Sequence, residues 1–579
     1  MVARVVPDVT GLDRAFDYVV PDALLSRVGI GTLVRVSLHG RRIGGWVVAL
    51  GSGDPALATT KLLPVIKVTG NGPTQDTIDL GRWAAQRWAG PLRAFMVSAS
   101  APGAVVALPA PAHGGPVPEP THSATTHLLR AGGGVVRHPP AGDIIPVLLA
   151  ACRLGPTLVV TPAVAQARLL SSRLRRAGRT VALMPQDWAQ AAGGVDVVIG
   201  ARGAVWAPCA ELASIVVLDE HDEGLQEERQ PTWHARDVAI ERGRMAGVPV
   251  LLVSPCPSAT AMFVTDADHV LRPSVSDERA GWPIVEIVDR TREDPWQTSL
   301  ATSALIRQIR DPQRQVVCVL NAVGRARLLA CRSCKALQRC EICEAAVHQR
   351  DDGQFECRRC GMVRPAVCQS CGAGAFAALR VGVTRLRDEL EAAAGRPVVA
   401  VAGKANDLES IADAGVYVGT EAVLHRVRRA DTVVFMDFDS ELLAPRYRAT
   451  EEALTLLARA ARLVGGRGNG GRILVQTNLP KHEVLDAVLH ADPGRLMARE
   501  LSRRQLLGFP PSAALGLVSG VGAAEFVGGL ALAGVQSAAT SDGTFMLRAP
   551  TWDALGTAIA GTPRPKASRL RIQIDPPRL

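Results

Sequence analysis

Eight cysteines within residues 331–371 are arranged as four Cys-x-x-Cys pairs. Two thiolates separated by two residues can bind one tetrahedral metal ion, and two such pairs complete a four-thiolate shell. The pattern predicts two structural zinc sites, hence two Zn(2+) ions per chain, but the spacing leaves open which pair joins which. Redox motifs and disulfides are the alternatives, and four repeats in so short a segment favour zinc. The predicted metal ligands are Cys331, Cys334, Cys340, Cys343, Cys357, Cys360, Cys368 and Cys371.

The cysteine-rich segment interrupts an α/β pattern instead of standing at one end of it. A strand-like run at 316–320 precedes the segment, and another at 398–401 follows it. This order predicts a zinc module inserted into an α/β lobe. The remaining cysteines stand singly among apolar residues, where we expect buried free thiols. They are Cys152, Cys209, Cys256 and Cys318.

Length and charge narrow the class of protein. A chain of 579 residues exceeds the size at which a single core stops growing, so several domains are expected. The formal net charge of +10 favours a polyanionic partner, because Lys and Arg that meet phosphates release counterions. The N-terminus lacks an apolar signal segment, and the apolar window 515–539 contains Glu525 and several glycines, which indicates buried core. We expect a cytoplasmic protein that makes no membrane contact.

Periodicity predicts an α/β multidomain protein. Alternating apolar runs predict a small β-rich domain over residues 1–70, and a helical pattern predicts a short helical, winged-helix-like domain over 71–100. A proline-rich linker, expected to be extended and exposed, follows at 101–124. Strand-like and helical stretches then alternate, which is typical of parallel sheets covered on both faces. The remaining predicted boundaries are 125–270 for a first α/β lobe, 271–330 and 373–484 for a second lobe, 331–372 for the zinc module and 485–579 for a C-terminal domain.

A series of short motifs follows one particular order along the chain. The motifs are Arg14-Ala15-Phe16-Asp17-Tyr18, Gly200-Ala201-Arg202, Ile215-Val216-Val217-Leu218-Asp219-Glu220-His221-Asp222, His234-Ala235-Arg236-Asp237, the paired cysteines, Gly419-Thr420, Asp437-Phe438-Asp439, Gln476-Thr477 and Phe509-Pro510-Pro511. In this order they resemble the PriA family, also called primosomal protein N′, the superfamily 2 helicase-type proteins of replication restart. The resemblance implies two helicase-type lobes and a DNA-binding N-terminal domain, in a cytoplasmic, nucleoid-associated protein.

The resemblance also implies a site for the 3′ end of a nascent DNA strand in the N-terminal domain. Its residues would be Phe16, Asp17, Tyr18, Gly40 and Lys61. A carboxylate can accept a bond from a terminal hydroxyl, an aromatic ring can stack on a base, and a lysine can meet a phosphate. The alternative is that the two aromatic residues are alternate residues of a strand and pack in the small core.

The phosphate-binding loop expected of a helicase lobe is missing. Such a loop needs glycines, a Lys that reaches the phosphates and a Ser or Thr that binds magnesium. Where Gly-Lys-Thr would fall, this chain has Gly142-Asp143-Ile144. A carboxylate in place of the lysine repels triphosphate, and Pro139 and Pro140 remove backbone N–H donors from the anion site.

Other helicase motifs have also changed. Asp219 and Glu220 remain in a motif one residue shorter than the family's, so we expect a vestigial nucleotide and magnesium site with no catalytic residue. Arg462 and Arg467, the nearest counterparts of the family's paired arginines, stand five residues apart instead of three. The segments 321–324 and 423–426 have also lost family residues. Together these losses predict a branch of the family with a degenerate ATP-binding motif, because phosphoryl transfer depends on positioning and charge stabilisation.

The sequence thus predicts a replication restart protein that binds abandoned or stalled forks without helicase or ATPase activity. The expected partners are forked or single-stranded DNA with a 3′ end, primosome proteins, a helicase loader or the replicative helicase, and single-strand binding protein. One alternative is an active ATP-dependent 3′-to-5′ DNA helicase with a non-standard phosphate-binding loop. Another is a regulatory adaptor whose vestigial lobes bind only proteins.

Overall fold

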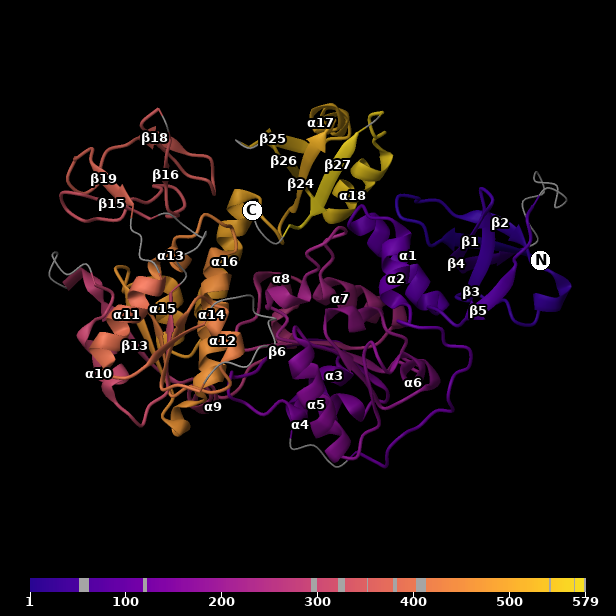
Figure 1. Cartoon of the computed structure of the whole chain (residues 1–579), viewed down its shortest axis with the longest axis horizontal. Helices are drawn as coiled ribbons and strands as arrows, with labels where there is room; N and C mark the ends of the chain where they lie inside the picture. The colour runs from indigo at the N-terminus through magenta and orange to yellow at the C-terminus, as the bar shows by residue number, and fades with distance from the viewer. Residues whose placement is uncertain are drawn as a thin grey trace.

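The computed structural model describes residues 1–51, 62–117, 122–292, 299–320, 328–350, 352–378, 383–401, 413–540, 543–566 and 568–576. Their strands form six sheets, which belong to an N-terminal domain, two α/β lobes, a zinc module and a C-terminal domain (Figure 1). The two lobes lie side by side at the bottom of this view, and the zinc module and C-terminal domain lie above them.

The N-terminal domain is an antiparallel sheet with strand order β2-β1-β4-β3-β5. Its strands alternate inward and outward residues, so that Val34 and Val36 are buried while Arg35 between them is exposed. The hairpin from β3 to β4 closes through His39 and Gly40, both at positive φ, as a two-residue turn between twisted strands requires. The strands are β1 (Val2–Pro7), β2 (Phe16–Val19), β3 (Leu33–Leu38), β4 (Arg41–Gly51) and β5 (Lys67–Gly70).

The helices α1 (Gln75–Arg87) and α2 (Leu92–Ala99) share one apolar core with the first lobe. The Phe95 ring lies 5.3 Å from Trp206, and Trp206 lies 5.5 Å from Trp233. The chain after α2 runs to residue 117 without helix or strand and is largely exposed. It is fixed at Ala112, whose carbonyl accepts a 2.7 Å bond from the Thr180 hydroxyl.

The first lobe is built on a parallel sheet of order β12-β6-β11-β10-β7-β9-β8. Its strands are buried on both faces, which explains their continuous runs of Val, Ile and Leu. The strands are β6 (Gly133–Arg137), β7 (Thr157–Val160), β8 (Val181–Leu183), β9 (Val197–Gly200), β10 (Ser214–Leu218), β11 (Val250–Ser254) and β12 (Val270–Leu271). The helices are α3 (Ser123–Arg130), α4 (Ile145–Cys152), α5 (Val164–Arg176), α6 (Trp188–Gly193), α7 (Ala235–Ala246) and α8 (Ala259–Phe263).

The second lobe has a parallel sheet of order β13-β23-β22-β14-β21-β20. Helix α15 (Glu483–Leu489) spans the predicted boundary near residue 485, and α16 (Gly494–Leu507) follows it; both contribute to the core of this lobe. The strands are β13 (Ile284–Asp289), β14 (Val316–Val319), β20 (Val398–Val401), β21 (Val416–Gly419), β22 (Thr432–Phe435) and β23 (Arg472–Thr477). The other helices are α9 (Val275–Gly281), α10 (Ser303–Arg310), α11 (Val383–Ala394), α12 (Val423–Arg426), α13 (Asp439–Leu442) and α14 (Ala449–Val464).

The zinc module is inserted between β14 and β20 of the second lobe. Strands β15 (Leu329–Cys331) and β19 (Phe376–Ala378) pair at its base, and β16 (His348–Gln349), β17 (Gln354–Glu356) and β18 (Val363–Pro365) form a small sheet within it. The insertion predicted from the cysteine-rich segment is therefore confirmed.

The C-terminal domain alternates strands and helices in the order β-α-β-β-α-β, the pattern of a ferredoxin-like fold. Its antiparallel sheet has the order β25-β26-β24-β27. The elements are β24 (Ala514–Val521), α17 (Ala523–Leu532), β25 (Gln536–Ala539), β26 (Phe545–Ala549), α18 (Trp552–Gly561) and β27 (Arg569–Ile574). The α/β multidomain architecture predicted from the sequence is confirmed.

Three of the four single cysteines, Cys152, Cys256 and Cys318, are buried free thiols as predicted. Cys209 is only half-buried, because it lies at the edge of the first lobe's core, so the prediction is wrong for this residue. Among the described residues, no helix has the length and apolarity needed to cross a membrane.

Candidate functional site

The two aromatic residues predicted to meet DNA lie on the inner face of β2. Tyr18 is buried in the core of the N-terminal domain, and its hydroxyl donates a 3.1 Å bond to the Ser37 carbonyl. Burial raises the pKa of Tyr18, so the phenol stays protonated and continues to donate. Phe16 is half-buried against the same core, with the Arg14 guanidinium 5.5 Å from the centre of its ring. In this arrangement the Tyr18 ring packs in the core, and Phe16 is partly accessible.

Asp17 points to the opposite face of the strand. Its carboxylate accepts two bonds from the Arg4 guanidinium, at 2.9 and 3.0 Å, across the β1–β2 pair. The Asp17 side chain is 14% exposed, whereas that of Arg4 is 57% exposed, so solvent reaches the pair mainly from the arginine side. Gly40 lies at the tip of the β3–β4 hairpin. Lys61 lies outside the described residues.

The eight paired cysteines form two four-sulfur clusters, and their pairing is nested. In the outer cluster, the Cys331 and Cys371 sulfurs are 3.6 Å apart and those of Cys334 and Cys368 are 3.5 Å apart. The inner cluster is made by the two pairs in between. Its members are Cys340, Cys343, Cys357 and Cys360, with 3.5 Å between the first and last sulfurs and 3.4 Å between the middle two.

Four sulfurs at such distances can surround one tetrahedral ion, so each cluster fits a metal with four thiolate ligands. The clusters differ in exposure. Cys334 and Cys371 of the outer cluster are exposed, whereas three ligands of the inner cluster are buried and Cys360 is half-buried. The module also contacts the second lobe, where the Leu443 carbonyl accepts a 2.8 Å bond from the Ala346 amide.

In the loop 139–145, backbone amides and the Asp143 carboxylate are engaged in hydrogen bonds within the protein. The Gly142 amide donates to the Pro139 carbonyl at 2.9 Å, and the Ala141 amide donates to the Gly281 carbonyl of the second lobe at 3.2 Å. The Asp143 carboxylate accepts a 3.1 Å bond from the Ile145 amide at the start of α4. It also pairs with Arg173 of α5 at 2.8 Å. These donors therefore face protein acceptors, and the Asp143 carboxylate is paired with Arg173.

Asp219, the first carboxylate of the predicted vestigial magnesium site, is bound by an arginine of the second lobe. Arg462 donates to its two oxygens at 2.8 and 2.6 Å, and Gln166 donates to it at 2.9 Å. Burial alone would raise the pKa of Asp219, but Arg462 and the Gln166 bond outweigh it and hold the pKa well below its usual range. The carboxylate is therefore ionised and already neutralised by the protein.

Glu220, the second carboxylate, is fully buried and engaged as well. It accepts bonds of 2.7 Å from both the Ser258 amide and the Ser258 hydroxyl. Arg236 donates at 3.4 Å to the same Glu220 oxygen as the Ser258 hydroxyl, and it also donates to that hydroxyl at 3.1 Å. The vestigial site stays a prediction, and sequence reasoning did not show that protein donors occupy both carboxylates.

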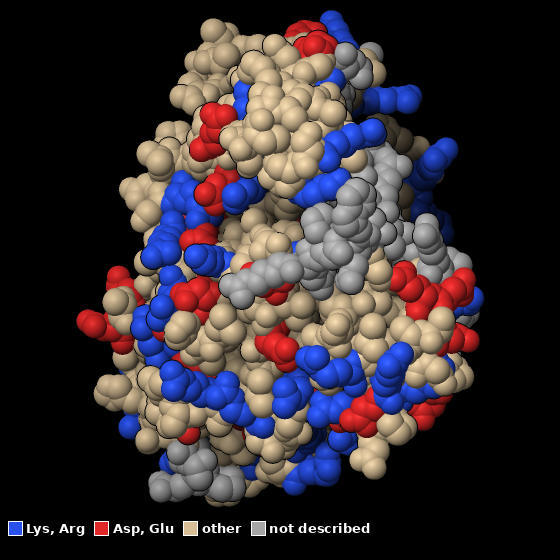
Figure 2. All heavy atoms as spheres, turned by 90° about the vertical axis from the view of Figure 1, so that its left-hand side faces the viewer, with Lys and Arg blue, Asp and Glu red and all other residues tan. Residues whose placement is uncertain are grey.

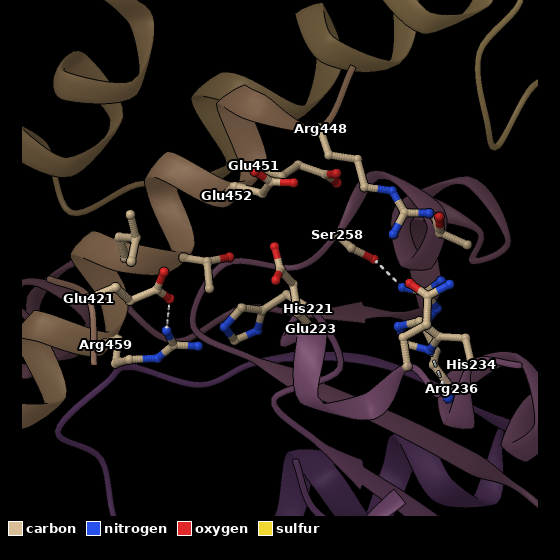
Figure 3. Close-up of a pocket in the computed structure, with 14 residues that line it drawn as sticks. His221, Glu223, His234, Arg236, Ser258, Glu421, Arg448, Glu451, Glu452 and Arg459 are labelled. Atoms are coloured by element: carbon tan, nitrogen blue, oxygen red, sulfur yellow. Dashed lines mark hydrogen bonds and ion pairs between the residues drawn. The ribbon is translucent and has the colours of Figure 1, made fainter. Parts of the chain in front are cut away.

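A third charged contact between the lobes involves Asp222 and Arg459, which are 2.8 Å apart. Arg459 also binds Glu421, and Figure 3 shows this pair at the side of a cavity between the lobes. The remaining walls include Arg236 and Arg448, on the opposite side of the cavity in this view. Sequence reasoning missed the interlobe role of Arg459. Its position one helical turn before Arg462 in an otherwise buried helix was the available signal.

The other altered motifs contribute less to this cleft. Arg467 is exposed at the turn after α14, and in the described residues no ion pair is assigned to it. Gln476 and Thr477 instead stabilise the second lobe, because Gln476 donates to the Leu300 and Met436 carbonyls and Thr477 binds Asp439. Segment 321–324 lies outside the described residues.

Comparison with known proteins is consistent with this geometry. Residues 4–100 match the family model of the PriA 3′DNA-binding domain. The replication restart protein PriA of Thermotoga maritima is 28% identical over 56% of this chain and 46% of the relative. The probable PriA of Mycobacterium tuberculosis is 30% identical over 57% of this chain and 52% of the relative. PriA of Bacillus subtilis is 24% identical over 56% of this chain and 43% of the relative.

The chain thus spans about half the length of the curated relatives it matches. Among solved structures, the DUF1998 helicase MrfA bound to DNA and AMPPNP is 11% identical over 66% of this chain and 54% of that chain, with a TM-score of 0.35, too low to support an inference. Residues 4–100 thus match a PriA-type 3′DNA-binding domain, and the chain as a whole is similar to several PriA proteins over about half of their length.

Proposed function

We propose that this chain is a replication restart protein that binds abandoned or stalled forks, namely branched DNA with a nascent 3′ end, without hydrolysing ATP. The observation that carries the proposal is the combination of a PriA-type 3′DNA-binding domain with two lobes that the chain's own ion pairs join across their cleft. The protein would then act as a scaffold on which the primosome assembles and the replicative helicase is reloaded.

Charge supports DNA as the partner. The net charge of +10 provides affinity for phosphates that does not depend on sequence. Lys and Arg side chains gather across the lower part of the face in Figure 2, with Asp and Glu between them. Helix α10 contributes the exposed Arg307 and Arg310 to the second lobe. We expect fork binding to weaken steeply as salt is raised, because counterions released from DNA drive the association.

The geometry of the cleft supports the absence of ATP turnover. Catalysis of phosphoryl transfer depends on a phosphate cradle, a metal ion and cationic groups placed in advance. In this chain Asp143 replaces the cradle lysine, and Asp219 is neutralised by Arg462. Because each missing element lowers the rate by orders of magnitude, their combined loss predicts an inactive motor.

We infer that the two cysteine clusters hold Zn(2+). Four thiolates in a tetrahedral arrangement are typical of structural zinc, which stabilises a small module that has little apolar core of its own. The zinc module would then keep a fixed shape where it contacts the second lobe. Contact of this module or the lobes with a helicase loader, the replicative helicase or single-strand binding protein is part of the same proposal.

The absence of turnover can be tested by measuring ATP hydrolysis in the presence of a synthetic fork. Zinc-loaded protein should bind the fork and show no DNA-stimulated hydrolysis, and Arg462→Ala should not restore it, because the cradle lysine is still missing. A turnover of about one per second or faster would contradict the proposal, since it lies in the ordinary range of enzymes. The chain would then be an active 3′-to-5′ helicase with a non-standard phosphate-binding loop.

The role of Asp17 can be separated from its pairing with Arg4. Asp17→Ala should reduce the preference for forks with a nascent 3′ hydroxyl by about tenfold, which corresponds to losing one hydrogen bond to a charged group. Arg4→Ala removes the same ion pair but keeps the carboxylate, and it should keep the preference. Fluorescence anisotropy with forks that carry or lack the 3′ hydroxyl gives the measurement. Equal effects of both variants would assign Asp17 a structural role only.

The two metal sites should differ in how readily they lose the ion. Metal analysis should find two zinc ions per chain, and titration with a chelator should release them in two phases, the exposed outer cluster first. Cys334→Ser should remove the fast phase and Cys343→Ser the slow phase, while Cys209→Ser should change neither. Protein purified without chelator that holds no zinc would refute the zinc assignment.

A further inference from the structure

Within the described residues, ion pairs between charged side chains join the two lobes directly at several points. Arg462 pairs with Asp219 at 2.6 Å and Arg459 with Asp222 at 2.8 Å, so two arginines of α14 in the second lobe bind two carboxylates that follow β10 in the first. Arg137 of the first lobe lies 2.8 Å from Asp492 of the second and also pairs with Glu278 of α9.

Each carboxylate is held in place by its own lobe. Gln166 donates to Asp219, and the Gly224 amide donates to Asp222 at 2.8 Å. Burial alone would raise the pKa of Asp222, but Arg459 outweighs it and lowers the pKa, so this group also stays ionised. The first lobe therefore presents two fixed negative charges toward α14, and separation of the lobes would leave both without their cations.

Backbone groups close the same interface. The Ala259 amide of the first lobe donates to the Glu451 carboxylate of the second. The Ala141 amide of the first lobe donates to the Gly281 carbonyl of the second. Both amides lose their partners if the lobes move apart, so they report on closure.

We propose that these ion pairs latch the two lobes in the closed arrangement, so that closure requires no bound nucleotide. Arg462 takes up the carboxylate that would otherwise face a metal ion, which makes closure a property of the chain alone. This inference deepens the proposed function and rests on it in one respect, since both concern the same cleft. The state of the lobes is measurable without DNA or hydrolysis, so the two can fail independently.

The test uses the full, zinc-loaded chain without DNA. Small-angle scattering gives the radius of gyration, and hydrogen exchange gives the protection of the Ala259 and Ala141 amides. Both are measured with and without magnesium and AMPPNP, a non-hydrolysable ATP analogue. The wild type should be compact, should protect both amides and should respond to neither addition. The variant Arg459→Ala with Arg462→Ala should expand, and the two amides should exchange at least tenfold faster, while core strand amides keep their rates.

Two further variants keep the test decisive. Arg244→Ala removes an exposed ion pair within α7 of the first lobe and should match the wild type, so a change there would show that loss of any arginine mimics opening. If the double alanine variant does not fold, Arg459→Lys with Arg462→Lys keeps the charge but not the paired geometry, and it should open partly. Rapid exchange of both amides in the wild type, or compaction only when AMPPNP and magnesium are added, would overturn the latch.

Discussion

The ion pair between Arg462 and Asp219 joins the second lobe to the first across the cleft. A buried carboxylate is costly unless a cation or several donors satisfy it. In a nucleotide-binding cleft a metal ion would supply that positive charge. Here an arginine of the facing lobe supplies it, and Arg459 does the same for Asp222 one turn earlier on α14. The charges of the cleft are therefore balanced within the chain, and a triphosphate would have to displace an ion pair and would meet Asp143 where a lysine is needed.

The segment from Leu443 to Glu451 contacts the zinc module, the C-terminal domain and the first lobe. The zinc module binds the Leu443 carbonyl at its start. Arg448, further on, lies 2.6 Å from Asp575 at the end of the C-terminal sheet, and the Tyr447 ring stacks 5.3 Å from Phe509. Glu451 at the start of α14 then accepts the Ala259 amide of the first lobe. Zinc module, C-terminal domain and both lobes thus meet on one short stretch of chain, and a closed cleft fixes their relative positions.

Sequence reasoning predicted those features that a local pattern of residues determines. Buried parallel strands appear as runs such as 215–218, and paired cysteines specify a tetrahedral site. It could not resolve the nested cysteine pairing, because every pair has the same spacing. It could not foresee that Arg462 meets Asp219, since these residues come together only when two lobes pack. The helices α1 and α2, predicted as a short domain, share a core with the first lobe because Phe95 packs on Trp206. Local periodicity identifies the apolar face of a helix but not its partner.

Under the proposed function, a cleft that does not turn over ATP would hold the domains of the chain in a fixed arrangement. A fork-binding protein built in this way would hold its 3′-end domain, zinc module and C-terminal domain at constant distances and leave unwinding to the helicase it helps to load. The most direct measurement is a calorimetric titration of AMPPNP with magnesium into the protein bound to a synthetic fork. The account predicts no binding tighter than a dissociation constant of about 1 mM, which corresponds to roughly 4 kcal/mol. A dissociation constant of about 1 μM would contradict it, because nucleotide would then occupy the cleft that the Arg462–Asp219 pair spans.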